Sequence, residues 1–152
     1  MKKIKQPSQF ERGFSEDHRG SVEFYNNIDL SYFKRFYMVS NPKEGTVRAW
    51  HGHKNEGKLI KVTKGNFLVG AVKIDNWDSP GKDLPVELFE INTEAGLLYI
   101  PPGYANGSMN FAPESNIMYF STAHLDDSIE DDYRFDSKFW DPWSGRGGVV
   151  FE

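Results

Sequence analysis

The stretch Gly45–Gly65, GTVRAWHGHKNEGKLIKVTKG, decides the fold expected for this chain. Glycines typical of turns bound it, and strand-like residues fill it, which predicts one β-hairpin. Side chains alternate between the two faces of a strand, so His51 and His53 share a face, whereas Arg48 has the opposite parity to His51. Imidazole transfers protons near neutral pH and is also the commonest metal ligand. The stretch therefore predicts a strand-borne site for proton transfer or for a metal.

Short strand-like runs separated by turns continue along the chain. Its 12 Phe, 7 Tyr and 4 Trp favour strands, while 14 Gly and 8 Pro interrupt them at short intervals. The expected strands are Ser21–Ile28, Phe33–Ser40, Thr46–Trp50, Gly57–Thr63, Asn66–Ile74, Val86–Ile91, Leu97–Ile100, Ser108–Phe111, Ile117–Ser121 and Val149–Phe151. This pattern predicts an all-β antiparallel sandwich or barrel. Only Ser128–Phe139 has the near-helical spacing of a short helix.

The length of 152 residues fits a single domain. Residues 1–14 are expected to form an N-terminal arm, and residues 126–152 a C-terminal extension. Six carboxylates between Asp126 and Asp136 predict a solvated face, because clustered carboxylates repel one another. The aromatic residues that follow are expected to close the end of the barrel or to pack on a partner.

Charge and composition exclude several classes of function. The net charge of −4 argues against binding to nucleic acid or to an anionic membrane surface, because both need a positive field. Without cysteine, neither disulfides nor thiolate catalysis are available. The start MKKIKQPSQFER lacks the apolar core of a signal peptide, and no apolar run approaches the roughly 20 residues of a membrane span. We therefore expect a cytoplasmic protein.

Two segments resemble the motifs of the cupin superfamily. The residues similar to the first metal motif are Gly45, His51, His53, Glu56 and Gly65. The run Gly96–Asn110, with its Pro-Pro-Gly turn, is similar to the second motif, and this resemblance implies a single-domain cupin jelly-roll β-barrel over residues 1–152. Asn106 stands where a metal cupin carries its fourth ligand, a histidine. An amide oxygen is a poor ligand for the metals that imidazole prefers, so no metal or other cofactor is expected.

A narrower resemblance covers about residues 15–121. In order, the motifs are Asp17-His18-Arg19-Gly20, Val47–His51, Gly57–Val62 with Gly65, Ile100–Gly107 and Met118-Tyr119. Together they resemble the dTDP-4-dehydrorhamnose 3,5-epimerase family of metal-independent cupins, which act on nucleotide-linked 4-keto sugars. Family members pair through their sheets, so the resemblance implies a homodimer that binds a nucleoside-diphosphate sugar, most simply a dTDP-linked one.

The resemblance also implies roles for five residues. His51 matches the base that removes a proton beside the keto group, and Lys58 matches the lysine that stabilises the enolate. Tyr119 matches the tyrosine that returns a proton to the opposite face. Arg19 and Arg48 match arginines that hold the pyrophosphate, and Arg19 is a candidate to reach the site of a partner subunit.

The chemistry calls for such groups independently. A proton beside a ketone is too weakly acidic for a lone imidazole in water, so the enolate oxygen needs a cation or donor such as Lys58. Epimerisation also needs an acid opposite the base, a role open to Tyr119. Arginine forks suit a diphosphate without requiring a basic protein.

Departures from the family keep a second activity open. Asn106 replaces a histidine of the epimerases, and His53 stands where they usually carry glutamine. The pair His51 and His53, with Tyr37, resembles the nucleotide-sugar 3,4-ketoisomerases, in which a tyrosine and two histidines move protons between C3 and C4. We therefore expect His53, Asn106 and Tyr37 to contact the substrate.

Two further points stay open at the level of sequence. The epimerases pair the base with a C-terminal aspartate, for which Asp136 and Asp141 are both candidates. The remaining alternatives to an epimerase or ketoisomerase are a metal-dependent cupin and a non-catalytic module that binds sugar nucleotides.

Overall fold

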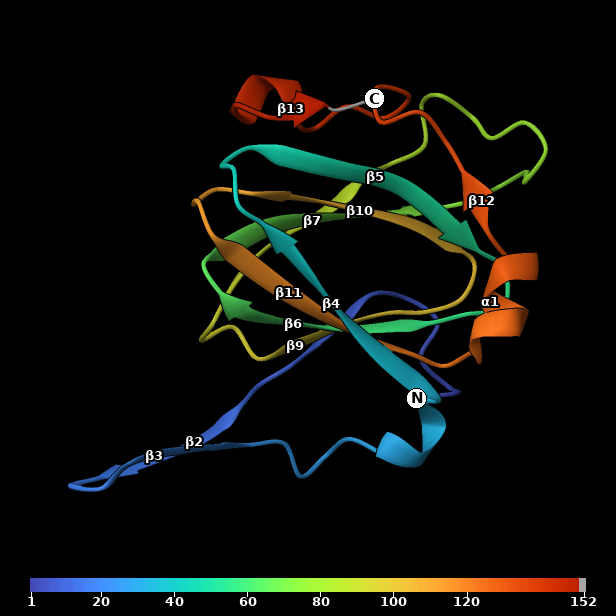
Figure 1. Cartoon of the computed structure of the whole chain (residues 1–152). Helices are drawn as coiled ribbons and strands as arrows, with labels where there is room; N and C mark the ends of the chain where they lie inside the picture. The colour runs from blue at the N-terminus through green and yellow to red at the C-terminus, as the bar shows by residue number, and fades with distance from the viewer. Residues whose placement is uncertain (151–152) are drawn as a thin grey trace.

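The computed structural model describes residues 1–150, which form two antiparallel sheets that face each other as layers of a barrel (Figure 1). The first sheet consists, in spatial order, of β1 (Ser8–Phe10), β9 (Leu97–Ile100), β6 (Lys58–Lys64), β11 (Ser115–Ser121) and β4 (Arg35–Asn41). The second consists of β12 (Tyr133–Arg134), β5 (Thr46–His53), β10 (Tyr104–Asn110), β7 (Asn66–Lys73) and β8 (Glu87–Asn92), with β13 (Val149–Val150) pairing in parallel to β5. The expected all-β jelly-roll barrel is confirmed.

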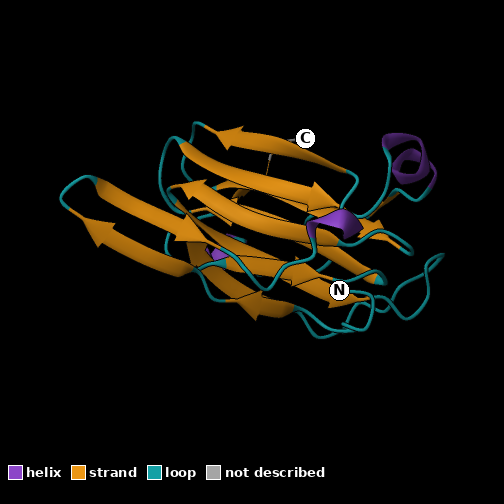
Figure 2. Ribbon diagram, turned by 90° about the horizontal axis from the view of Figure 1, so that it is seen from below, coloured by secondary structure: helices purple, strands orange, loops and turns teal. Residues whose placement is uncertain are grey.

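A hairpin, a short helix and two 3₁₀ turns lie outside these layers. The strands β2 (Gly13–Asp17) and β3 (Gly20–Phe24) form a separate hairpin, and the helix α1 spans Leu125–Glu130. Both views place the tip of the hairpin and α1 at opposite ends of the molecule (Figure 1, Figure 2). Single 3₁₀ turns cover Leu30–Tyr32 and Ser144–Arg146. Across the described residues, no helix is long and apolar enough to cross a membrane.

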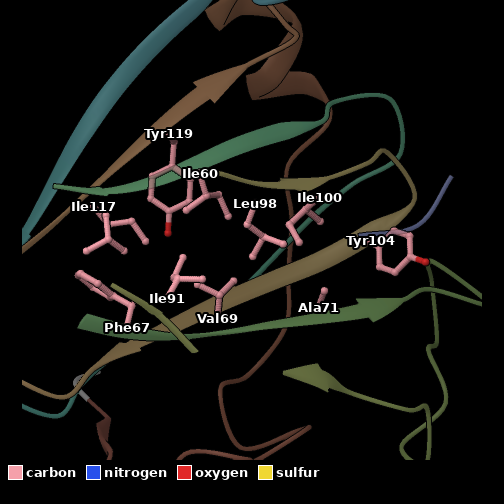
Figure 3. Packing of buried hydrophobic residues seen from close by; sticks show 11 residues of the cluster. Ile60, Phe67, Val69, Ala71, Ile91, Leu98, Ile100, Tyr104, Ile117 and Tyr119 are labelled. Atoms are coloured by element: carbon pink, nitrogen blue, oxygen red, sulfur yellow. The ribbon is translucent and has the colours of Figure 1, made fainter. Parts of the chain in front are cut away.

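The inward faces of both sheets supply the core of the barrel. The buried side chains of this cluster, most of them labelled in Figure 3, are Ile60, Val62, Phe67, Val69, Ala71, Ile91, Leu98, Ile100, Tyr104, Ile117 and Tyr119. They recur at every second position along their strands, as strand geometry requires. Burial of this apolar surface is the main force that holds the two layers together.

The outer face of the second sheet is covered by the C-terminal segment. Trp140 and Trp143 pack there against Trp50 and Met109, so β7 is buried on both of its faces. Trp140 and Trp143 therefore cover the outer face of this sheet, whereas they were expected at the end of the barrel or on a partner. The N-terminal segment covers the outer face of the first sheet in the same way, with Phe10 packed against Leu97 and Tyr99.

The hairpin predicted over Gly45–Gly65 is wrong. β5 pairs with β10 and β12, whereas β6 pairs with β9 and β11 in the other sheet. The loop between them crosses from one layer to the other, and the carboxylate of Asp131 accepts hydrogen bonds from the backbone amides of Lys54, Asn55 and Glu56. This distant carboxylate satisfies the loop amides, which removes the need for a tight turn.

Several expected boundaries also change. The helix expected over Ser128–Phe139 is instead α1, at Leu125–Glu130, followed by β12, which pairs with β5. Asp126 and Asp127 occupy the first turn of α1, where their negative charges interact favourably with the positive end of the helix dipole. β10 begins at Tyr104 rather than Ser108, and the N-terminal arm includes β1, which pairs with β9. The last strand is confirmed over Val149–Val150, while Phe151 lies outside the described residues.

Candidate active site

A cavity of about 340 Å³ opens between the two sheets beside α1. Its walls come from β4, β5, β6, β10 and β11, and from the segment 125–134. The lining residues are Arg35, Tyr37, Val39, Arg48, His51, His53, Lys58, Asn106, Tyr119, Leu125, Ser128, Ile129, Asp132 and Arg134. Seven of the eight residues expected at the site therefore lie around one cavity, and Arg19 is the exception.

A β-bulge brings Arg48 and His51 to the same cavity. On β10, Asn106 lies opposite His51 and Ser108 opposite Arg48, so two steps along β10 match three steps along β5. The extra residue shifts the alternation of side chains. The expected opposite parity of Arg48 and His51 is therefore wrong, because it assumed an unbroken strand.

His51 has the properties of a neutral base. Burial, followed by the nearby cation of Arg134, lowers the pKa of His51 from 6.5 to about 4. The imidazole is thus uncharged at neutral pH and ready to accept a proton. Asp132 acts in the opposite direction and raises the pKa of His51.

Lys58 lies on β6 with its ammonium group held by two oxygens. Its Nζ is 2.7 Å from Oε1 of Glu56 and donates a hydrogen bond of 2.8 Å to the hydroxyl of Tyr37. Burial lowers the pKa of Lys58, and the carboxylate of Glu56 opposes that shift. The result is a desolvated cation in a fixed position, which is the arrangement that best stabilises a developing negative charge.

Tyr37 and Tyr119 form a stacked pair across neighbouring strands. Their rings lie 5.2 Å apart at an angle of 17°, and they are direct partners in the pairing of β4 with β11. Burial raises the pKa of Tyr37 to about 12, and it also raises that of Tyr119. Both phenols keep their protons at neutral pH and can donate them. Figure 3 shows Tyr119 beside aliphatic side chains of the core such as Ile60 and Ile117. Tyr119 also lines the cavity.

His53 and Asn106 occupy fixed positions on the second sheet. Nδ1 of His53 lies 2.7 Å from the backbone oxygen of Asp131 and 3.1 Å from Oε2 of Glu56. A carbonyl oxygen only accepts hydrogen bonds, so Nδ1 carries the proton. Asn106 donates a hydrogen bond of 3.4 Å to the backbone oxygen of His51.

Charged residues that sequence reasoning missed complete the cavity. Arg35, Asp132 and Arg134 line it, and Arg134 pairs with Asp132 at 3.0 Å. Arg35 and Tyr37 lie two positions apart on β4 and share a face, so strand alternation could have predicted Arg35 at the site. Asp132 and Arg134 reach the cavity only because β12 pairs with β5, which no local pattern indicated. Asp132 and the buried Asp131 also correct the expectation that this acidic segment is wholly solvated.

The two candidate partners of His51 are engaged elsewhere. Asp136 accepts a hydrogen bond from the backbone amide of Lys138. Asp141 accepts from the amides of Trp143 and Ser144 in the next turn. Among the described residues, Asp132 is the aspartate that both lines the cavity and acts on the pKa of His51.

Arg19 lies at the tip of the β2–β3 hairpin, away from the cavity of its own chain (Figure 1). Its guanidinium pairs with Asp17, and 79% of its side chain is exposed. Arg19 therefore does not reach the cavity of its own chain, where it was expected to help hold a pyrophosphate, and only the site of a partner subunit is left for that role. Within residues 1–150, no group of three or more His, Cys, Asp or Glu side chains is arranged to hold a metal ion.

The fold and the cavity define a cupin-type jelly-roll barrel whose site joins a neutral imidazole, a buried ammonium group and two phenols. The family model described as dTDP-4-dehydrorhamnose 3,5-epimerase matches residues 2–142. The chain therefore belongs to the dTDP-4-dehydrorhamnose 3,5-epimerase family, a family of isomerases. No curated protein sequence matches the chain.

Solved structures with the same fold include both activities considered from the sequence. The chain is 25% identical to a dTDP-4-dehydrorhamnose 3,5-epimerase from Sulfolobus tokodaii, with a TM-score of 0.71 over 91% of this chain and 81% of that one. It is 22% identical to the Bacillus anthracis enzyme of that name with TDP and PPi bound, with a TM-score of 0.74 over 95% and 89%. A TDP-quinovose 3,4-ketoisomerase from Campylobacter jejuni is 20% identical, with a TM-score of 0.69 over 90% and 98%.

Proposed function

We propose that this protein epimerises a nucleoside-diphosphate 4-keto-6-deoxy sugar at C3, C5 or both. The observation that carries the proposal is the meeting of His51, Lys58 and the phenols of Tyr37 and Tyr119 around one cavity. Abstraction of a proton beside a ketone needs a neutral base, a cation for the enolate oxygen and a separate acid. The cavity supplies all three.

The proposed reaction has two proton transfers. His51 takes the proton from the carbon beside the keto group, and the electron pair moves to the carbonyl oxygen to form the enolate. Lys58 stabilises that oxygen through its ammonium group. Tyr119 then donates a proton to the opposite face of the carbon, which inverts it and restores the ketone.

The charges around the cavity suit a diphosphate. Four cationic side chains line it, namely Arg35, Arg48, Lys58 and Arg134, against the single lining carboxylate of Asp132 among the described residues. Nε of Arg48 donates a hydrogen bond of 2.8 Å to Asn41, which orients its guanidinium. A positive cavity in a chain of net charge −4 favours a local anion such as a nucleotide diphosphate, most simply a dTDP-linked sugar.

We place this reaction in the cytoplasm.

A nucleotide-sugar 3,4-ketoisomerase is the second candidate function. His51, His53 and Tyr37 line the same cavity, and they are the three residues that resemble the ketoisomerases. That reaction shares the first proton abstraction, but it returns the proton at the neighbouring oxygen-bearing carbon.

We also propose a homodimer in which the β2–β3 hairpin of each chain contacts the other. An isolated two-stranded hairpin is marginal in water. The hairpin exposes Phe14, Val22 and Phe24, and β4, at the edge of its sheet, exposes Phe36 and Met38. A second copy would bury these apolar side chains and bring Arg19 toward a neighbouring site.

The test is incubation with a dTDP-4-keto-6-deoxy sugar in deuterated water, followed by NMR of the product. Deuterium at C3 or C5 with inversion supports epimerisation, and a 3-keto product supports isomerisation. The absence of exchange at every carbon would contradict both. The matched variant His51→Ala should keep its affinity for dTDP while it loses exchange.

A further inference from the structure

Glu56 is a buried carboxylate that the proposed proton transfers do not use. Its side chain is fully enclosed, at 0% exposure, behind the wall of the cavity. Each oxygen contacts several groups. Oε1 lies 2.7 Å from Nζ of Lys58 and 3.4 Å from Arg35, and it accepts a hydrogen bond of 2.5 Å from Ser121. Oε2 accepts a 2.7 Å hydrogen bond from Ser128 and lies 3.1 Å from Nδ1 of His53.

These contacts join groups from five separate elements of the fold, and Ser121 of β11 is the one that lies outside the cavity lining. Lys58 comes from β6, His53 from β5, Arg35 from β4 and Ser128 from α1. All four line the cavity, whereas Glu56 itself does not. A single buried charge therefore lies behind several walls of the site at once.

We propose that Glu56 is the positioning residue of this site, which fixes the ammonium group of Lys58 and the imidazole of His53 toward the cavity and keeps Lys58 charged. The inference rests on the proposed function, because it assigns Glu56 a role in the same proton-transfer chemistry.

The first part of the argument concerns Lys58. Burial disfavours the ammonium form, so an enclosed lysine without a counter-charge tends to lose its proton. Glu56 opposes this effect at 2.7 Å. Burial raises the pKa of Glu56, but the hydrogen bond and positive charge of Lys58 and the hydrogen bonds from Ser121 and Ser128 outweigh it and lower the pKa to about 2. The Glu56 carboxylate therefore remains ionised. The charged and titratable groups that face Lys58 are Glu56, Arg35, Tyr37, Asp132 and His51.

The second part concerns His53. Its Nδ1 faces both Glu56 and the backbone oxygen of Asp131, so the ring is held from one edge. Nε2, on the other edge, is left as the nitrogen available to a bound molecule. A ring fixed by acceptors at Nδ1 cannot turn without breaking both contacts.

The contrasting possibility is that Glu56 only stabilises the fold. Buried ion pairs often contribute little net stability, because desolvation of both charges offsets their attraction. A purely structural role predicts a change in unfolding free energy alone. A positioning role predicts a change in the protonation of Lys58 in the folded protein.

The experiment is an NMR titration of lysine side chains in the free protein, with the Lys58 signal identified by its loss in Lys58→Met. In Glu56→Gln, the pKa of Lys58 should fall by about one unit or more, because the opposing charge is removed. In turnover assays of Glu56→Gln, kcat should fall about tenfold or more, while KM changes little. The alkaline limb of its kcat–pH profile should move to lower pH. Glu56→Asp, which keeps the charge, should restore part of both effects.

A matched control is the carboxylate partner of Lys61, another lysine of β6. Glu23 pairs with Lys61 of β6 and with Arg12, outside the cavity. Glu23→Gln should leave the pKa of Lys58 unchanged. If Glu56→Gln does not fold, the reciprocal measurement applies: in Lys58→Met, the pKa of Glu56 should rise.

An unchanged Lys58 pKa in folded Glu56→Gln, or an unchanged Glu56 pKa in Lys58→Met, overturns the proposal. Both titrations use the free protein. A wild-type chain that lacks activity on keto sugars would therefore refute the proposed function without deciding the role of Glu56.

Discussion

The ammonium group of Lys58 on β6 donates a 2.8 Å hydrogen bond to the hydroxyl of Tyr37 on β4. The phenol accepts through its oxygen, so its own proton remains free to be donated. Tyr37 also stacks on Tyr119, so the two protonated phenols lie together, with Tyr37 in contact with the cation. Their contributions can be separated by experiment.

Removal of the acid should uncouple proton abstraction from inversion. In Tyr119→Phe, His51 still removes the proton and returns a solvent deuteron from the same side. We therefore expect deuterium in sugar of unchanged configuration, with the epimer reduced at least about a hundredfold. NMR of the recovered sugar measures both. Tyr37→Phe is the matched variant, and if it alone showed this behaviour, Tyr37 would be the acid instead.

The pKa of His51 should respond to Arg134. The Arg134 cation lowers that pKa, and its partner Asp132 raises it. Arg134→Gln removes the cation and frees the carboxylate, so both changes raise the pKa of His51 above its value of about 4. Histidine NMR in the free protein checks the shift directly. Asp132→Asn should move the pKa in the opposite direction, and equal signs for the two variants would contradict this account.

Acid should destabilise the protein through His51. The folded pKa is about 4 and the ordinary value is 6.5, so below pH 6.5 the unfolded chain binds a proton that the folded chain does not. This contribution to stability is therefore fully present above pH 6.5 and is lost as the pH falls toward 4, by on the order of 3 kcal/mol. Urea unfolding of wild type and His51→Gln across this window measures the loss.

The exposed His124 provides the control for that measurement. His124→Gln should retain the wild-type dependence on pH, whereas His51→Gln should flatten it. A dependence that is equally steep in both variants would show that other groups cause the acid sensitivity.

The proposed dimer makes Arg19 testable by complementation. Arg19→Ala and His51→Ala should each be nearly inactive alone. If Arg19 serves the partner site, a mixed dimer contains one site with both changes and one intact site, so random mixing should restore roughly a quarter of wild-type activity. Co-expression with two tags and an epimerase assay measures the recovery. If Arg19 acted in its own chain, mixing would restore nothing, and if it had no role, Arg19→Ala alone would remain active.

The sequence determined the elements of the site better than their arrangement. Short motifs, through the family resemblance that they carry, singled out His51, Lys58, Tyr37 and Tyr119, all of which line the cavity. The same local rules failed at the Gly45–Gly65 hairpin, because they assume that neighbouring strands pair. Asp131, far along the chain, instead satisfies the connecting loop.

The bulge of β5 between Arg48 and His51 could not be predicted from the local sequence pattern either. It depends on the register between β5 and β10, which the packing of both strands sets together. For the same reason, Arg134 and Asp132 became visible as site residues only when β12 was found beside β5.

By itself, the sequence indicated the all-β barrel, and its family motifs singled out His51, Lys58, Tyr37 and Tyr119 for the site. The barrel follows from residue types and turn signals along the chain, and the four site residues follow from the resemblance that the short motifs carry. Only the tertiary structure decided which charges surround them. The contacts of Glu56 with Lys58, Arg35 and Ser128 join residues up to 72 positions apart. Such contacts depend on how the two sheets close over each other, and no local pattern encodes that distance.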